Sequence, residues 1–166
     1  QELTKYCRYG LINMKVSLKK LTQQITKVLL FTGSRDLEAK HYPTVLRATL
    51  LGIEELVGPL EGHTYNHLII CRHGDARGGD TLFKEAINTS ENHLLSRGIR
   101  VKPDPHPYFK HLGKAGGPAR NKYMIEFDPK PDLCIAVELT GALNRGTRGC
   151  AKMASDAKIK VQTYRT

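Results

Sequence analysis

Tryptophan is absent from the 166-residue chain, and aromatic residues of all kinds make up only 7% of it. The four cysteines are Cys7, Cys71, Cys134 and Cys150. They are scattered without C-x-x-C spacing or nearby paired histidines, which disfavours a zinc site or a disulfide framework and favours a reducing, cytoplasmic compartment. No apolar run approaches the roughly 20 residues that span a bilayer, and no secretory signal is recognisable, so we expect no membrane partner.

Acidic residues are also scarce, since 16 Asp and Glu stand against 26 Lys and Arg, for a net charge of +10. Half of this excess lies in the first 27 residues, where six basic residues accompany Glu2 alone. Apolar residues recur there at helical spacing, which suggests a short amphipathic helix over Ser17–Thr26. We expect residues 1–26 to form a basic extension and residues 27–166 a single domain. The extension either docks on nucleic acid or another acidic partner, or is simply solvated.

From Lys27 onward, apolar runs of strand length alternate with stretches of helical period. The expected strands are Val28–Thr32, His67–Cys71, Ile99–Lys102, Leu133–Val137 and Ile159–Gln162. Helices are expected over residues 42–57, 82–95, 118–125 and 146–157, and the Pro- and Gly-rich residues 103–117 read as a long loop. Strands that are apolar on both faces and alternate with helices predict a parallel sheet covered on both sides. The expected fold is α/β, a Rossmann-like doubly wound domain.

The unusual sequences all follow expected strands: GSRD at 33–36, HGDARGGD at 73–80, the 103–117 loop, and NRGT at 144–147. In such sheets ligands bind outside the carboxyl ends of the strands. Glycines at helix starts expose backbone N–H groups to anions, and Arg35 and Arg120 add cationic groups. Asp75 and Asp80 can accept hydrogen bonds from ribose hydroxyls. We therefore expect the four loops to form one cationic site for a phosphorylated sugar.

A family resemblance rests on five motifs in order: LLFTGSRD, HGDARGGD, GKAGGPARN with Met124 four residues after Arg120, PDLCIAV and NRGT. Together they resemble the YspA-type family of the SLOG superfamily, which is Rossmann-like and includes cytokinin-activating phosphoribohydrolases and DNA-processing protein A. The match covers roughly residues 27–163. It implies a nucleotide-binding domain, with no cofactor or metal expected, that self-associates as a homodimer or larger homo-oligomer. The residues it places in the pocket are Gly33, Ser34, Arg35, Gly74, Arg77, Gly78, Asp80, Arg120, Asn121, Gly146 and Thr147, which Asp75 joins as a ribose acceptor.

Two classes of function stay open, with a weaker third. The first is a non-catalytic binder that senses or sequesters an ADP-ribose-like ligand. Several SLOG relatives are thought to be nucleotide-signal receptors in conflicts between phages and bacteria, so a phage protein that captures such a signal fits this reading. The second is an N-glycosidase like the phosphoribohydrolases. The third is nucleic-acid binding through the basic extension and the sheet edge.

The hydrolase pattern is matched only in part. That branch uses an Arg on a helix, which Arg120 resembles, and a Glu after a P-G-G-x-G-T turn. Residues 143–147 read LNRGT instead, and Cys150 stands where the Glu would be. We expect Cys150 to be buried and not a nucleophile. Three other carboxylates either replace the Glu or only cap helices and hold Arg77 or Arg145, namely Asp75, Asp80 and Glu138.

Loop side chains near the expected mouth leave further alternatives. Three histidines either serve as acid–base groups or ligands, or are ordinary loop residues: His73, His106 and His111. Tyr108 and Phe109 in the 103–117 loop either stack on a base or only cover the sheet edge.

Overall fold

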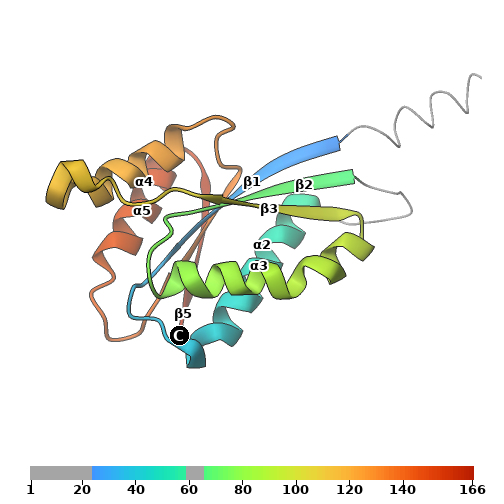
Figure 1. Ribbon diagram of the computed structural model, residues 1–166, viewed down its shortest axis with the longest axis horizontal. Coiled ribbons are helices and arrows are strands. Elements are labelled where there is room, and N and C mark those ends of the chain that lie inside the picture. Colours follow the sequence, from blue (N-terminus) through green and yellow to red (C-terminus); the bar gives the residue numbers. More distant parts are fainter. Residues whose placement is uncertain (1–23, 59–65) are drawn as a thin grey trace, which may run out of the picture.

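A computed structural model describes residues 24–58 and 66–166 of the chain. In this part a five-stranded, all-parallel sheet carries helices on both faces, which confirms the predicted α/β doubly wound fold (Figure 1). The elements in chain order are β1 (Gln24–Gly33), η1 (Ala39–His41), α2 (Tyr42–Val57), β2 (Asn66–His73), α3 (Gly79–Ser96), β3 (Ile99–Pro105), η2 (Lys110–Ala115), α4 (Gly116–Glu126), β4 (Leu133–Glu138), α5 (Arg145–Asp156) and β5 (Lys160–Arg165).

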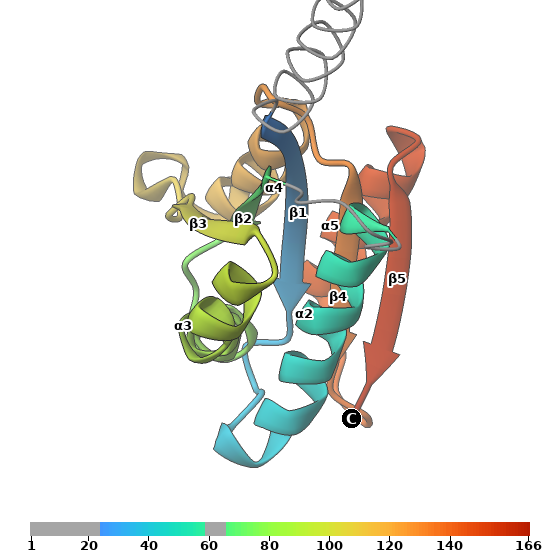
Figure 2. The ribbon, with the colours of Figure 1, turned by 90° about the vertical axis from the view of Figure 1, so that its right-hand side faces the viewer.

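The strands lie in the order β3-β2-β1-β4-β5, so the side on which successive strands are added to the sheet changes at β1. The chain first moves outward from β1 through β2 to β3, and then crosses back to β4 and β5 on the other side of β1. Helices α2 and α3 pack together on one face, and α4 and α5 pack together on the other (Figures 1 and 2). The loops after the neighbouring strands β1 and β4 therefore lead to opposite faces. A crevice at their carboxyl ends is the consequence.

Two apolar cores attach the helices to the sheet. Successive side chains of a strand point to opposite faces, so Leu29 and Phe31 of β1 join the core under α2 and α3. Leu30 of the same strand turns the other way and joins Met124 of α4 and Cys150 of α5. Cys150 is fully buried, as predicted. Burial on both faces explains why the central strands read as unbroken apolar runs.

Two expected segments differ from the structure by more than a few residues at an element's end. Gln24–Thr26 belong to β1, where they pair with Asn66–Leu68 of β2, so the helix expected over Ser17–Thr26 is wrong for these three residues. Pairing with a neighbouring strand outweighs the local helical period. The rest of the basic extension, on which the nucleic-acid hypothesis depends, lies outside the described residues. The 103–117 loop is shorter than expected, because β3 continues to Pro105 and η2 occupies Lys110–Ala115.

A buried cation in β2 was not anticipated from its apolar sequence. The side chain of Arg72 is 1% exposed, and its Nε donates to Asp104 Oδ2 on β3 at 2.7 Å. Its Nη1 donates to the carbonyl oxygens of Met124 and Phe127, both at 2.9 Å. Arg72 thereby fastens the end of α4 to the edge of the sheet, and α4 carries part of the crevice wall.

Replacing Arg72 should destabilise the domain markedly. We expect Arg72→Met to lower the free energy of unfolding by roughly 3 kcal/mol, because the buried carbonyl of Met124 and the partly buried carbonyl of Phe127 and carboxylate of Asp104 lose the Arg72 donor. Urea unfolding measures the loss. The exposed pair Lys27–Asp132 provides the control, and Lys27→Met should cost less than about 1 kcal/mol. Equal small losses in the two variants would contradict the anchoring role of Arg72.

Candidate functional site

A cavity of about 740 Å³ opens at the carboxyl ends of the strands, and segments after β1, β2, β3 and β4 all contribute to its wall. Nine of the predicted site residues line it: Gly33, Ser34, Arg35, Gly74, Asp80, Arg120, Asn121, Gly146 and Thr147. A smaller cavity of about 240 Å³ is lined by some of the same residues and adds Asp75 and Arg77. Gly78 lines neither of them. The four loops therefore meet at one edge of the sheet.

Glycines let the first two loops approach backbone to backbone. A Cβ atom on Gly33 would lie 2.8 Å from the Cα of Gly79, closer than real Cβ atoms come. The N–H of Gly79 donates to the carbonyl of Ser34 at 2.9 Å. Gly78 has φ 75° and lies against the carbonyl of Arg35, so only glycine suits it. Its role is to join the loops, which explains why it is absent from the cavity wall.

Arg120 holds the second and third loops together beneath the cavity. It is 6% exposed, and its Nη1 donates to the carbonyl oxygens of Gly74 and His106. The guanidinium lies directly against Gly74, where a Cβ atom would clash with Nη1 of Arg120. Burial lowers the pKa of Arg120, and the negative charge of Asp80 acts in the opposite direction. Arg120 therefore sets the position of these loops as well as adding charge to the wall.

Asp80 is a buried carboxylate in the cavity wall. It is 5% exposed, and its Oδ2 accepts the N–H of Ala76 at 3.0 Å. Burial raises the pKa of Asp80 to about 6, against the opposing effects of backbone hydrogen bonds and the charge of Arg120. Its protonation state therefore changes just below neutral pH, where a general acid or base would be useful.

Two helices direct their N-termini at the cavity. Helix α4 begins at Gly116 and α5 at Arg145, and no side-chain hydrogen bond caps either helix. The N–H of Gly116 itself donates to the backbone carbonyl of Gly113, so the N–H groups of α4 that face the cavity begin at Gly117. Gly117 and Gly146, in the first turns, line the cavity, and apart from its chain neighbours and the backbone of its own helix, nothing lies within 4 Å of where a Cβ atom on Gly146 would be. The unpaired N–H groups and the dipole of a helix N-terminus attract anions. Both first turns are accordingly suited to a phosphate group.

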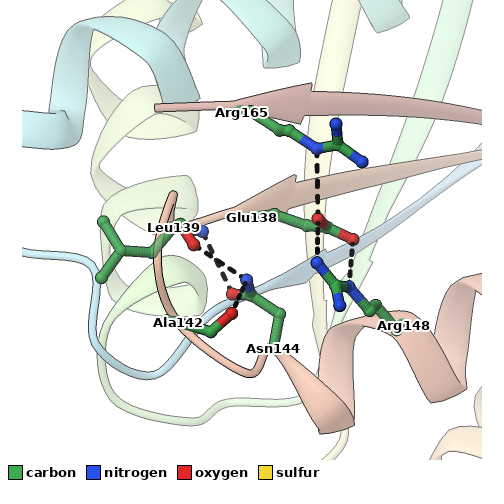
Figure 3. A network of polar contacts seen from close by, with 6 residues as sticks. All are labelled: Glu138, Leu139, Ala142, Asn144, Arg148 and Arg165. Atoms are coloured by element: carbon green, nitrogen blue, oxygen red, sulfur yellow. Dashed lines mark hydrogen bonds and ion pairs between the residues drawn. The ribbon is translucent and has the colours of Figure 1, made fainter.

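The turn before α5 is held in shape by Asn144, whose backbone is left-handed with φ 48° (Figure 3). Its Nδ2 donates to the carbonyl oxygens of Leu139 and Ala142 at 2.9 and 3.0 Å. Its Oδ1 accepts the N–H of Leu139 at 3.1 Å. Because the side chain of Asn144 is hydrogen-bonded to Leu139 and Ala142 of the preceding turn, it does not cap the first N–H groups of α5.

Glu138 is engaged in ion pairs and does not line either cavity (Figure 3). Its two carboxylate oxygens accept Nε and Nη2 of Arg148 at 3.0 Å each, and Arg165 Nε approaches Oε2 at 3.3 Å. The hydrogen bond from Arg148 holds the pKa of Glu138 below its usual range. Glu138 therefore holds arginines, as one of the two sequence-based alternatives has it, but these are Arg148 and Arg165 rather than Arg77 or Arg145.

Asp75 is likewise paired, with Lys84 Nζ at 2.8 Å from Oδ1, and this hydrogen bond lowers the pKa of Asp75. His73 is fully buried, its Nδ1 accepts the N–H of Asp75, and burial lowers its pKa to about 4. Burial raises the pKa of the Cys150 thiol to about 11, which leaves it protonated at neutral pH. The cavity walls formed by the described residues include none of the three loop histidines.

Sequence reasoning missed two cations of the wall, Lys114 and Arg145. Both were visible in the motifs GKAGGPARN and NRGT, next to glycines that open a helix. With Arg35 and Arg120 they give four cations, against the acidic residues Asp36 and Asp80. The wall therefore carries an excess of positive charge. Arg77, at the smaller cavity, pairs with Asp36 at 3.8 Å and stays exposed.

In comparisons with known proteins, no family model, curated protein or solved structure matches the chain. The relationship to the YspA-type family and the expected self-association accordingly stay proposals based on the motifs. Within residues 24–58 and 66–166 no group of three or more His, Cys, Asp and Glu side chains is placed to hold a metal ion. In the same ranges no helix is long and apolar enough to cross a membrane.

The raised pKa of Asp80 predicts a pH-dependent cost to stability. Native Asp80 keeps its proton up to about pH 6, whereas in the unfolded chain its carboxyl releases the proton near the ordinary aspartate pKa of 3.8. The native state thus binds more protons between these values, and the contribution of Asp80 to stability falls as the pH rises through them.

Asp80→Asn keeps an acceptor for Ala76 and removes the titration. Relative to the unsubstituted protein, this variant should gain stability from pH 4 to pH 7, by up to about 3 kcal/mol. Urea unfolding at pH 4 and pH 7 measures the difference in free energy of unfolding between the variant and the unsubstituted protein. The contributions of all other titrating groups cancel in this difference. A difference that does not change with pH would contradict the raised pKa.

Proposed function

We propose that the chain binds a nucleotide or nucleotide-derived ligand through its phosphorylated ribose in the 740 Å³ cavity, and acts as a sensor or sequestering protein. The observation that carries the proposal is the convergence of two helix N-termini, neither with a side-chain cap, and four cations on one cavity. Its volume lies in the range of small-molecule sites. The motifs make the YspA-type family of the SLOG superfamily the proposed relationship, and an ADP-ribose-like compound is the kind of ligand that follows.

The charge of the wall supports an anionic ligand. Arg35 lies near enough to Arg120 that its charge contributes to lowering the pKa of Arg120. Like charges gathered in one wall repel each other, and a bound anion relieves the repulsion. Asp80 is partly protonated near pH 6 and so opposes an anion least below that value. We therefore expect binding of ADP-ribose, whose pyrophosphate keeps the same charge over this range, to tighten as the pH falls toward 5.

Small buried polar groups beside the cations suit the sugar. Ser34, Asn121 and Thr147 line the cavity and are each less than a tenth exposed. The hydroxyl of Ser34 already accepts the N–H of Asp36 at 3.3 Å and has its own proton to donate. Hydroxyl and amide groups of this kind exchange hydrogen bonds with ribose hydroxyls and fix the orientation of a ligand.

A panel of small molecules tests the proposal. AMP, ADP-ribose, NAD and ribose 5-phosphate should raise the melting temperature, whereas adenosine, which lacks a phosphate, should have little effect. Arg145→Ala should weaken AMP binding about ten-fold or more, because a charge-assisted contact to phosphate is lost. Arg47, an exposed arginine of α2 outside the cavity, gives the matched control Arg47→Ala. Failure of every phosphate-bearing compound to shift the melting temperature would overturn the proposal.

One observation favours a second candidate, an N-glycosidase. Asp80 faces the cavity with a pKa of about 6, as an acid–base residue needs, while Glu138 and Asp75 are held in ion pairs. In this reading Asp80 activates water against the bond between the base and the ribose.

Product analysis separates the binder from the enzyme. Mass spectrometry after long incubation with AMP should find the ligand intact if the protein only binds it. Free adenine and ribose 5-phosphate in equal amounts would establish the hydrolase, and Asp80→Asn should then abolish product formation while AMP still binds. Product formation that survives Asp80→Asn would remove Asp80 from the mechanism.

A further inference from the structure

The two cavities of the site share a wall but differ in chemistry. Arg35, Tyr108 and Arg120 belong to both. Gly117 and Gly146, in the first turns of α4 and α5, line only the large cavity, which therefore has the helix N-termini. The small cavity lacks these helix starts, and its wall consists largely of the shared residues Tyr108, Arg35 and Arg120 together with Arg77 and Asp75. Aromatic rings and planar guanidinium groups both stack on nucleic-acid bases.

Tyr108 is fixed in place on one side and open on the other. Its hydroxyl donates to the carbonyl of Gly113. Its ring lies against the start of α4, since an ideal Cβ on Gly117 would be 3.5 Å from its Cε2 and one on Gly116 3.0 Å from its Cζ. The residue is nevertheless 37% exposed and lines both cavities. An aromatic ring held in this way loses little conformational entropy when a ligand stacks on it.

The neighbouring aromatic residues behave differently. Phe109 contacts the ring of Tyr123 with centroids 5.8 Å apart, and Tyr123 contacts Phe127 at 5.0 Å. These rings pack on one another beside His106 at the end of β3 and line neither cavity. Among the described residues, Tyr108 takes part in no such ring contact. The sequence left open whether Tyr108 and Phe109 stack on a base or only cover the sheet edge. In the structure the two residues differ, because Phe109 covers the sheet edge whereas Tyr108 faces the cavities.

We propose that the small cavity is the base subsite of a nucleotide whose sugar phosphate occupies the large one, with Tyr108 as the stacking platform. This inference rests on the proposed function and narrows the ligand to a compound that still carries its base. An aromatic ring stacks on the flat face of a base, and every base has such a face. Purine and pyrimidine nucleotides should therefore both bind. The guanidinium groups of Arg35 and Arg77 are placed to contact the same base.

Calorimetric titration with AMP and ribose 5-phosphate tests the inference, because the two compounds differ by the base alone. The unsubstituted protein should bind AMP roughly ten-fold or more tightly than ribose 5-phosphate. Tyr108→Leu should remove most of this difference, chiefly by weakening AMP binding. Tyr108→Phe keeps the ring and should retain the difference. Tyr123→Leu, at an equally exposed tyrosine outside both cavities, should retain it as well.

The outcomes that contradict the base subsite are distinct from those that contradict nucleotide binding. If AMP and ribose 5-phosphate bind the unsubstituted protein equally tightly, the base subsite is wrong and the phosphate site stands, and this comparison requires no variant to fold. If Tyr108→Leu weakens both compounds alike, Tyr108 shapes the cavity and is no platform. If neither compound binds, the proposed function itself fails, and the base subsite fails with it.

Discussion

Strands β1 and β4 lie side by side, yet the loops that follow them must reach helices on opposite faces of the sheet. Because the two loops diverge, neither covers the carboxyl ends of β1 and β4, and a crevice is left between the loops. The other features of the site depend on it. Gly33 ends β1 at one side of the crevice, Asn144 shapes the turn at the other, and α5 begins with its N–H groups directed between them.

Close contacts beneath the crevice hold its loops in fixed positions relative to one another. The contact of Gly33 with Gly79 and that of Gly74 with Arg120 each exclude a Cβ atom. A guanidinium that binds two carbonyl groups is a rigid spacer between loops. The exposed cations of the wall are Arg35, Lys114 and Arg145, and these can respond to a bound anion. The buried Arg120 instead holds the loops in position.

The amino-acid sequence predicts the sheet because burial on both faces imposes continuous apolar runs at Val28–Thr32 and Leu133–Val137. It predicts the convergence of loops because the carboxyl ends of parallel strands meet at one edge. It does not predict the ion pairs, since nothing in the sequence distinguishes Glu138, paired with Arg148, from the cavity carboxylate Asp80. The burial of Arg72 escapes notice for the same reason, because its partners come from β3 and the end of α4, distant in the chain.

The most direct measurement of the central claim is an amide NMR titration of the ¹⁵N-labelled protein with AMP. A phosphorylated ribose held by the two helix N-termini should shift the backbone N–H signals of Gly117, Gly146 and Thr147, which line the cavity, with the largest changes where phosphate accepts their hydrogen bonds. Binding that leaves these three signals in place, or that shifts signals only on the face covered by α2 and α3, would contradict the account.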